Sequence, residues 1–143
     1  MRTKTAFLLP AVLTIAALLA ACEQKPEPVA TSLSARIASV DAGAARGEDD
    51  PASARARKAL AATAQACRAS ELQVAEMIAK VRKVLVGEGK TVVMTELLEA
   101  TPALLADAAV DADTCQKLYA AYTVARQGGQ NHEVALAAVK IRK

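Results

Sequence analysis

Aromatic side chains are scarce in this sequence. Only 2% of its 143 residues are aromatic, namely one phenylalanine and two tyrosines, and tryptophan is absent. Because aromatic rings supply much of the area that a core buries, a core of alanine and small aliphatic residues is thin. Small domains with thin cores often need a covalent link. The scarcity also counts against a sugar-binding cleft, in which aromatic rings stack on sugars.

The sequence has a single histidine and no strong excess of one charge. The net charge is +3, and without Arg2 and Lys4 the remainder carries one more basic than acidic residue. This balance implies no nucleic-acid partner. The only histidine, His132, lies beside a glycine pair, so we expect a solvated loop residue rather than a general base. A zinc site of Cys67, Cys115 and His132 would lack a fourth ligand, and no metal or cofactor is expected.

The one long apolar run lies at the N-terminus. Arg2 and Lys4 precede it, Ala6 to Leu19 is apolar except for Pro10 and Thr14, and small residues then lead to Cys22. This order is that of a secretory signal. The run is at the lower limit of what spans roughly 30 Å of hydrocarbon. A membrane span is therefore the less favoured alternative.

The end of this run resembles the bacterial lipobox. Leu19-Ala20-Ala21-Cys22 places small residues before a cysteine. In that family a signal peptidase cuts before the cysteine, and its sulfur and new amino group carry acyl chains. The resemblance implies that residues 1–21 are a signal peptide and that Cys22 is lipidated. More than one acyl chain suffices for stable membrane attachment.

The residues after the cysteine bear on which membrane is reached. In enterobacterial lipoproteins an aspartate directly after the lipidated cysteine favours the inner membrane. Glu23 and Gln24 do not match that signal. We therefore expect the periplasmic face of the outer membrane, with the inner membrane as the alternative.

Residues 22–50 have the composition of a tether. They are rich in proline, serine and glycine and end in the acidic run Glu48-Asp49-Asp50. Such composition rarely packs. Leu33, Ile37 and Val40 have helical spacing and would allow a short, weak helix. The expectation is nevertheless a mostly disordered segment.

Residues 51–143 read as an all-α domain of four or five short helices. Asp50-Pro51 begins a helix that runs to about Cys67, and Ser70 with Gln73 forms a capping box for the next. Its apolar face is Val74, Met77, Ile78, Val81, Val84 and Leu85, with a favourable Glu76–Lys80 pair opposite. Gly87 and Gly89 end this helix.

The second half of the domain is less clear. Val92 to Ala100 is ambiguous, because "TVVM" at residues 91–94 has strand composition whereas Thr91 as a cap favours a helix. Thr101-Pro102 would restart or kink such a helix. Asp113 with Gln116 indicates another helix, which ends at Gly128-Gly129. Asn131 can cap a last helix, whose expected inner face is Val134, Ala138 and Ile141.

Two cysteines remain once Cys22 is assigned to lipid. Cys67 and Cys115 each fall on an apolar helical stripe, and export would place them in an oxidising compartment. We therefore predict one inter-helix disulfide. It would close a loop with a sequence separation of 48, worth roughly 4 kcal/mol in the chain-entropy model.

Other candidate groups have ordinary structural explanations. The acidic pairs Glu96–Glu99 and Asp111–Asp113 could in principle serve glycoside hydrolysis, but solvated surface or capping is favoured. Ordinary helix surface is likewise favoured over contact with anionic lipid or an acidic partner for a basic cluster, Lys80, Arg82, Lys83 and Lys90. We expect Tyr119 and Tyr122 to lie in the core rather than in a binding interface. No catalytic residue is expected.

The sequence thus predicts a lipid-anchored periplasmic lipoprotein that acts as a non-enzymatic binding or accessory module for an envelope or secretion component. Through Cys22, Cys67 and Cys115 its layout is similar to that of type II secretion pilotins, small helical lipoproteins with one disulfide. The alternative is an immunity or entry-exclusion lipoprotein that blocks a toxin or a conjugation apparatus. An envelope hydrolase is more remote. The expected partners are the membrane, through Cys22, and an envelope protein, with no small-molecule substrate.

Overall fold

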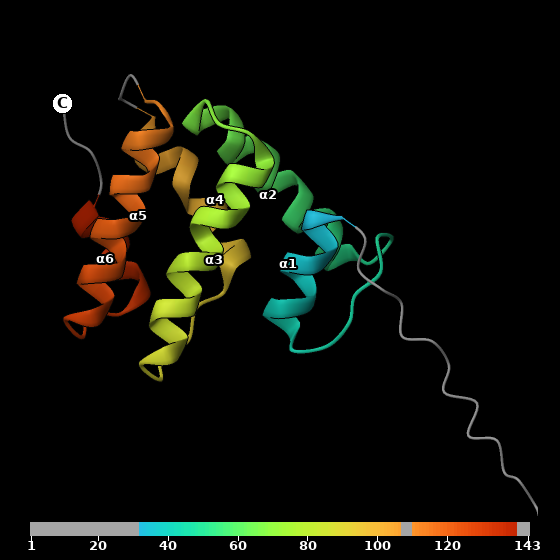
Figure 1. Ribbon diagram of the computed structural model, residues 1–143, viewed down its shortest axis with the longest axis horizontal. Coiled ribbons are helices and arrows are strands. Elements are labelled where there is room, and N and C mark those ends of the chain that lie inside the picture. The colour runs from blue at the N-terminus through green and yellow to red at the C-terminus, as the bar shows by residue number, and fades with distance from the viewer. Residues whose placement is uncertain (1–31, 107–109, 140–143) are drawn as a thin grey trace, which may run out of the picture.

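The computed structural model describes residues 32–106 and 110–139, which form six helices and no strand. Figure 1 shows their arrangement. The all-α prediction is confirmed, with five helices after residue 50 and one before it. The helices are α1 (Leu33–Ala42), α2 (Pro51–Cys67), α3 (Glu71–Gly87), α4 (Met94–Leu105), α5 (Ala112–Gln127) and α6 (His132–Val139).

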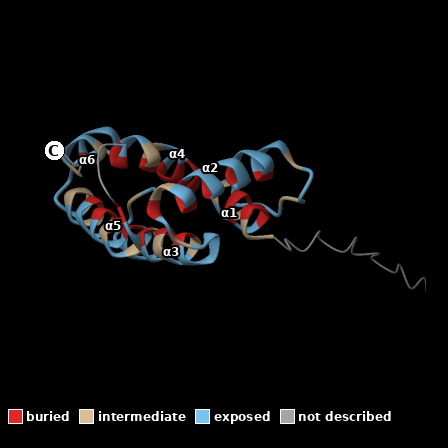
Figure 2. Cartoon of the chain, turned by 90° about the horizontal axis from the view of Figure 1, so that it is seen from above, coloured by how far each residue is buried: buried red, intermediate tan, exposed pale blue. Residues whose placement is uncertain are grey.

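The helices pack in two layers around one core. α3 and α5 lie side by side in one layer and α2 and α4 in the other, while α1 packs chiefly on α2 and α6 on α5. Figure 2 shows that the buried residues lie between these layers. The largest fully buried side chains include Tyr119, Tyr122, Leu60, Ile78 and Leu85. The two tyrosines thus supply the bulk that the aliphatic residues lack.

The starts of α2 and α3 follow the sequence signals. The backbone amide of Ala52 donates to Asp50 Oδ1 at 2.8 Å, and the reciprocal hydrogen bonds between Ser70 and Gln73 complete the capping box. The expected Glu76–Lys80 ion pair, in contrast, does not form within the described part of the chain.

The expectation of disorder is wrong for residues 33–42, which form α1. Ser32 caps this helix through the amide of Ala35. Ile37 and Ala38 are buried within the core cluster. A short helix gains most of its stability from tertiary packing, and here the alanine-rich surface of α2 lets α1 approach closely. The helical domain therefore begins before Pro51, whereas Cys22 lies outside the described residues.

α4 is a helix that receives its cap from a distant part of the chain. It begins at Met94 rather than near Thr91, and its N-cap residue, Val93, offers no side-chain oxygen. Asp41 of α1 supplies the acceptors instead. The amides of Met94 and Thr95 donate to its two carboxylate oxygens at 2.8 and 2.9 Å, and the Thr95 hydroxyl also donates at 2.7 Å.

Pro102 lies inside α4, which continues through it. Because proline has no amide hydrogen, it cannot donate to the carbonyl of Leu98, four residues earlier. The hydroxyl of Thr63 on α2 donates to that carbonyl at 2.7 Å, and both groups are buried. The interruption expected at Thr101-Pro102 is thus satisfied by the neighbouring helix.

The ends of α5 and α6 need two corrections. Asp111, not Asp113, caps α5, where it accepts from the amide and the hydroxyl of Thr114. Asn131 caps α6 as predicted. The inner face of α6 is Ala135, with Leu136 and Val139 partly buried, whereas Val134 is half exposed and Ala138 is exposed. Ile141 lies outside the described residues.

Candidate functional site

The predicted disulfide is present. Cys67, the last residue of α2, is bonded to Cys115 in the first turn of α5, with their Cα atoms 5.7 Å apart. Neither residue is exposed to solvent. Because a buried cystine is shielded from reductant while the domain is folded, this bond acts as a structural link between two helices.

Tyr119 is a core residue, as predicted, and its hydroxyl has a partner. Its oxygen lies 3.0 Å from Thr101 Oγ1, which itself donates to the carbonyl of Leu97 at 2.8 Å. Tyr119 therefore donates to Thr101. Burial raises the pKa of Tyr119 to about 12, because the phenolate would lose its hydration.

His132 is not a solvated loop residue. It opens α6, and its Nδ1 lies 2.8 Å from the hydroxyl of Tyr122, with the two rings edge to face. Arg126 also reaches that hydroxyl, at 3.4 Å, and donates to the carbonyl of Thr91 at 3.0 Å. Burial raises the pKa of Tyr122. The contact between Tyr122 and His132 holds α6 against α5.

Three of the four acidic candidates are engaged in structural contacts, and the fourth, Glu96, lies in the first turn of α4. Glu99 accepts two hydrogen bonds from the guanidinium of Arg55, at 2.6 and 2.5 Å, and this contact lowers the pKa of Glu99. Asp111 caps α5, and Asp113 pairs with Lys117 at 2.6 Å. These partners give the carboxylates roles at helix ends and on the surface, as the sequence favoured.

A groove between α3 and α5 is the first candidate binding surface. We call it the α3–α5 groove. Its volume is about 350 Å³, and it has exposed apolar rims, with Val84 43% and Val124 66% exposed. Buried Val81 and Tyr119 lie beneath. Its lining residues are Met77, Lys80, Val81, Val84, Gln116, Tyr119, Ala120, Thr123 and Val124.

A second groove runs along the opposite side of α3. Two adjoining hollows of about 270 and 510 Å³ share Val40, Ala79 and Met94. We call them together the α1–α3 groove. From α1 it is lined by Leu33, Arg36, Ile37 and Val40, and from α3 by Leu72, Ala75, Glu76, Ala79, Arg82, Lys83, Val86 and Gly87.

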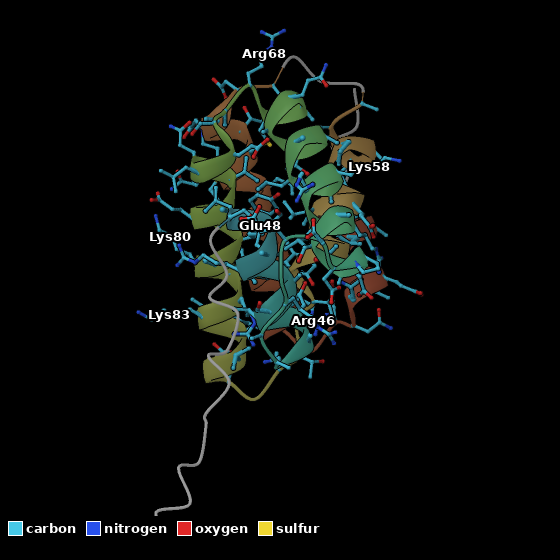
Figure 3. The ribbon with its side chains drawn as sticks, turned by 90° about the vertical axis from the view of Figure 1, so that its right-hand side faces the viewer. Arg46, Glu48, Lys58, Arg68, Lys80 and Lys83 are labelled. Carbon is cyan, nitrogen blue, oxygen red and sulfur yellow. A yellow bond between two sulfur atoms is a disulfide. The ribbon has the colours of Figure 1, made fainter. Side chains whose placement is uncertain are left out.

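The basic cluster is divided between these surfaces. Lys80 lines the α3–α5 groove, whereas Arg82 and Lys83 line the α1–α3 groove. Figure 3 shows Lys80 and Lys83 extending away from the bundle along α3. Lys90 pairs with Glu88 at 3.1 Å. The four basic residues therefore do not line a single groove.

Sequence reasoning missed both grooves. It assigned Val84 and Met77 to the core face of α3, but Val84 is exposed and Met77 only partly buried. The available signal was the width of the apolar face, because a core-facing stripe spans about 100° of a helix. An apolar face much wider than this stripe extends into solvent.

Other kinds of site find no support in residues 32–106 and 110–139. No group of metal-ligating side chains there could hold an ion, and no helix there has the length and apolarity to cross a bilayer. Comparisons with protein families, curated proteins and solved structures found no match to this chain.

Proposed function

We propose that this protein is a lipid-anchored, non-enzymatic binding module that faces the periplasm from the outer membrane and contacts an envelope protein through the α3–α5 groove. The observation that carries the proposal is the exposure of Val84 and Val124 on the two rims of this groove. Exposed apolar surface that is bordered by polar residues, here Lys80, Gln116 and Thr123, is typical of protein interaction sites.

The location in the proposal is supported by two features. The lipobox-like segment ends at Cys22, and the buried Cys67–Cys115 bond is typical of exported proteins. A lipid anchor at one end of the chain would confine the domain to the membrane surface. Binding through a groove on the domain would then hold a partner at that surface.

Site-specific photo-crosslinking in intact envelopes tests the groove. A photoreactive amino acid at Val124 or Ala120 of the full-length chain should capture the same protein. Val84→Arg should abolish both products, because a charge would then occupy the apolar rim. The matched control is Val134, which is 50% exposed but lies on α6. Equal capture at Val134, or capture unaffected by Val84→Arg, would refute the site.

Two further measurements test the anchor and its location. Palmitate should label the wild type and not Cys22→Ser, because the sulfur of Cys22 is the proposed lipid acceptor. In a density gradient the protein should follow outer-membrane markers. Labelling of both forms would remove the lipid anchor, and migration with inner-membrane markers would contradict the location.

A further inference from the structure

α3 carries a second apolar stripe besides the one that faces the core. Leu72, Ala79 and Val86 recur at intervals of seven residues, with Ala75 and Arg82 between them. Alternating spacings of three and four residues are those of the a and d positions of a helix–helix seam. The core-facing residues of α3 form a separate stripe, Val74, Ile78, Val81 and Leu85.

This stripe lines the α1–α3 groove and is open to solvent. Leu72 is 54% and Val86 44% exposed, and Val40 on the opposite wall is 41% exposed. Ala79, at the centre, is exposed and small. A small residue at the centre of a helical stripe allows a second helix to approach closely.

The stripe is self-complementary about Ala79. Leu72 and Val86 lie seven residues on either side of it, and Glu76 and Lys83 lie three residues before and four residues after it. If two copies of α3 packed antiparallel with Ala79 at a two-fold axis, Leu72 would meet the partner's Val86. Glu76 would then lie beside the partner's Lys83, because both side chains project to the same side of the helix pair.

Two unpaired charges support this arrangement. Glu76 forms no ion pair within the described part of the chain. Lys83 is exposed and forms no ion pair among the same residues either. In the dimer the Glu76 carboxylate of each copy would pair with the Lys83 ammonium of the other.

We propose that the α1–α3 groove is an isologous dimer interface, in which α3 packs antiparallel against α3 of a second copy. Each groove between α1 and α3 then receives the partner's α3, and the four helices form a bundle across the two-fold axis. Such self-complementary contacts are the rule for two-fold homodimers. The α3–α5 groove remains open, because Lys80 and Val84 line it from the other side of α3.

Disulfide trapping at the axis tests the dimer. In the full-length chain in its own envelope, Ala79→Cys should form a homodimer linked through residue 79 under mild oxidation, since only a residue near a two-fold axis meets itself. The matched control is Ala61→Cys, at an exposed alanine of α2, which should stay monomeric. Mass spectrometry of both variants should show the Cys67–Cys115 bond intact.

Charge reversal tests the register in the same trapping assay. Glu76→Arg should lower the homodimer yield about ten-fold, because like charges then face each other. Adding Lys83→Glu should restore the yield, whereas Lys80→Glu alone should leave it unchanged. Circular dichroism of each variant checks the fold.

Several results would overturn the dimer. They are equal trapping at residues 61 and 79, a product of Ala79→Cys with a different protein, and no recovery on full charge reversal. A monomer in sedimentation equilibrium of the purified full-length chain in density-matched detergent would do the same. None of these results bears on capture at Val124, so the dimer and the partner-binding groove succeed or fail separately.

Discussion

At the scale of single residues, Thr63 is the clearest case of a side chain that completes another helix. Its hydroxyl satisfies the carbonyl that Pro102 leaves without a donor in α4. We expect Thr63→Val, which keeps the shape and removes the donor, to lower the free energy of unfolding by about 1–3 kcal/mol, the usual cost of a buried unsatisfied group. Urea unfolding measures this loss.

A double-mutant cycle isolates the cause. Pro102→Ala restores an amide that can donate to Leu98, so Thr63→Val should cost less in that background. Thr123→Val is the matched control, because the Thr123 hydroxyl donates to the carbonyl of Tyr119 inside an uninterrupted helix. An equal cost of Thr63→Val in both backgrounds would contradict this account.

Tyr119 gives a prediction for alkaline pH. Its pKa is raised to about 12 by burial, against roughly 10 in an unfolded chain. The unfolded state therefore loses the proton first as pH rises. The contribution of Tyr119 to stability should be constant below about pH 9 and fall between about pH 10 and 12, by about 2–3 kcal/mol in total.

Urea unfolding between pH 8 and 12 checks the slope. Tyr119→Phe cannot ionise at this position and should show a smaller decline over the same interval. It also loses the hydrogen bond to Thr101, so its stability at pH 8 should be lower by about 0.5–1.5 kcal/mol. An alkaline decline of the same size in the variant would exclude Tyr119 as its source.

At the scale of helices, Asp41 joins α1 to α4. Its carboxylate accepts from the amides of Met94 and Thr95, so the first turn of α4 depends on a helix about fifty residues earlier. We expect Asp41→Ala to cost about 0.5–2 kcal/mol, the usual range for a lost N-cap. It should also speed amide hydrogen exchange throughout α1, because α1 loses its tie to α4.

Asp111→Ala is the matched control for this prediction. Asp111 caps α5 from within its own sequence, so its removal should lower stability similarly and leave α1 protected relative to the rest of the domain. Two results would show that Asp41 does not hold α1 to α4. One is a selective loss of hydrogen-exchange protection in α1 after Asp111→Ala, and the other is unchanged protection of α1 after Asp41→Ala.

At the scale of the whole molecule, the disulfide joins two groups of helices. α2 packs chiefly on α1 and α4, whereas α5 packs on α3 and α6, and Cys67–Cys115 links α2 directly to α5. Cys67→Ala or Cys115→Ala should cost roughly 2–5 kcal/mol. The double variant should lose about as much as either single one, because all three remove one bond.

Thermal and urea unfolding of the three variants measure these losses. Reductant should lower the melting temperature of the wild type and leave the double variant unchanged. Additive losses in the double variant, or a melting temperature of the wild type that reductant does not change, would contradict a stabilising disulfide.

The all-α fold, the ends of α2 and α3 and the pairing of the cysteines followed from the sequence. Each depends on signals that act within a few residues, such as the Ser70–Gln73 capping box, or on the count of cysteines left after Cys22. Local hydrogen bonding and helical periodicity need no knowledge of distant segments.

Only the tertiary structure determined that residues 33–42 fold into a helix, that a distant residue caps α4 and that two grooves are open on the surface. α1 is stable because α2 offers a close-packing surface, and α4 begins where Asp41 reaches its amides. The exposure of Val84 depends on the distance between α3 and α5, and that of Leu72 on the distance between α3 and α1. Sequence periodicity shows that a helix face is apolar, but the spacing of neighbouring helices determines whether that face is buried or left open for a partner.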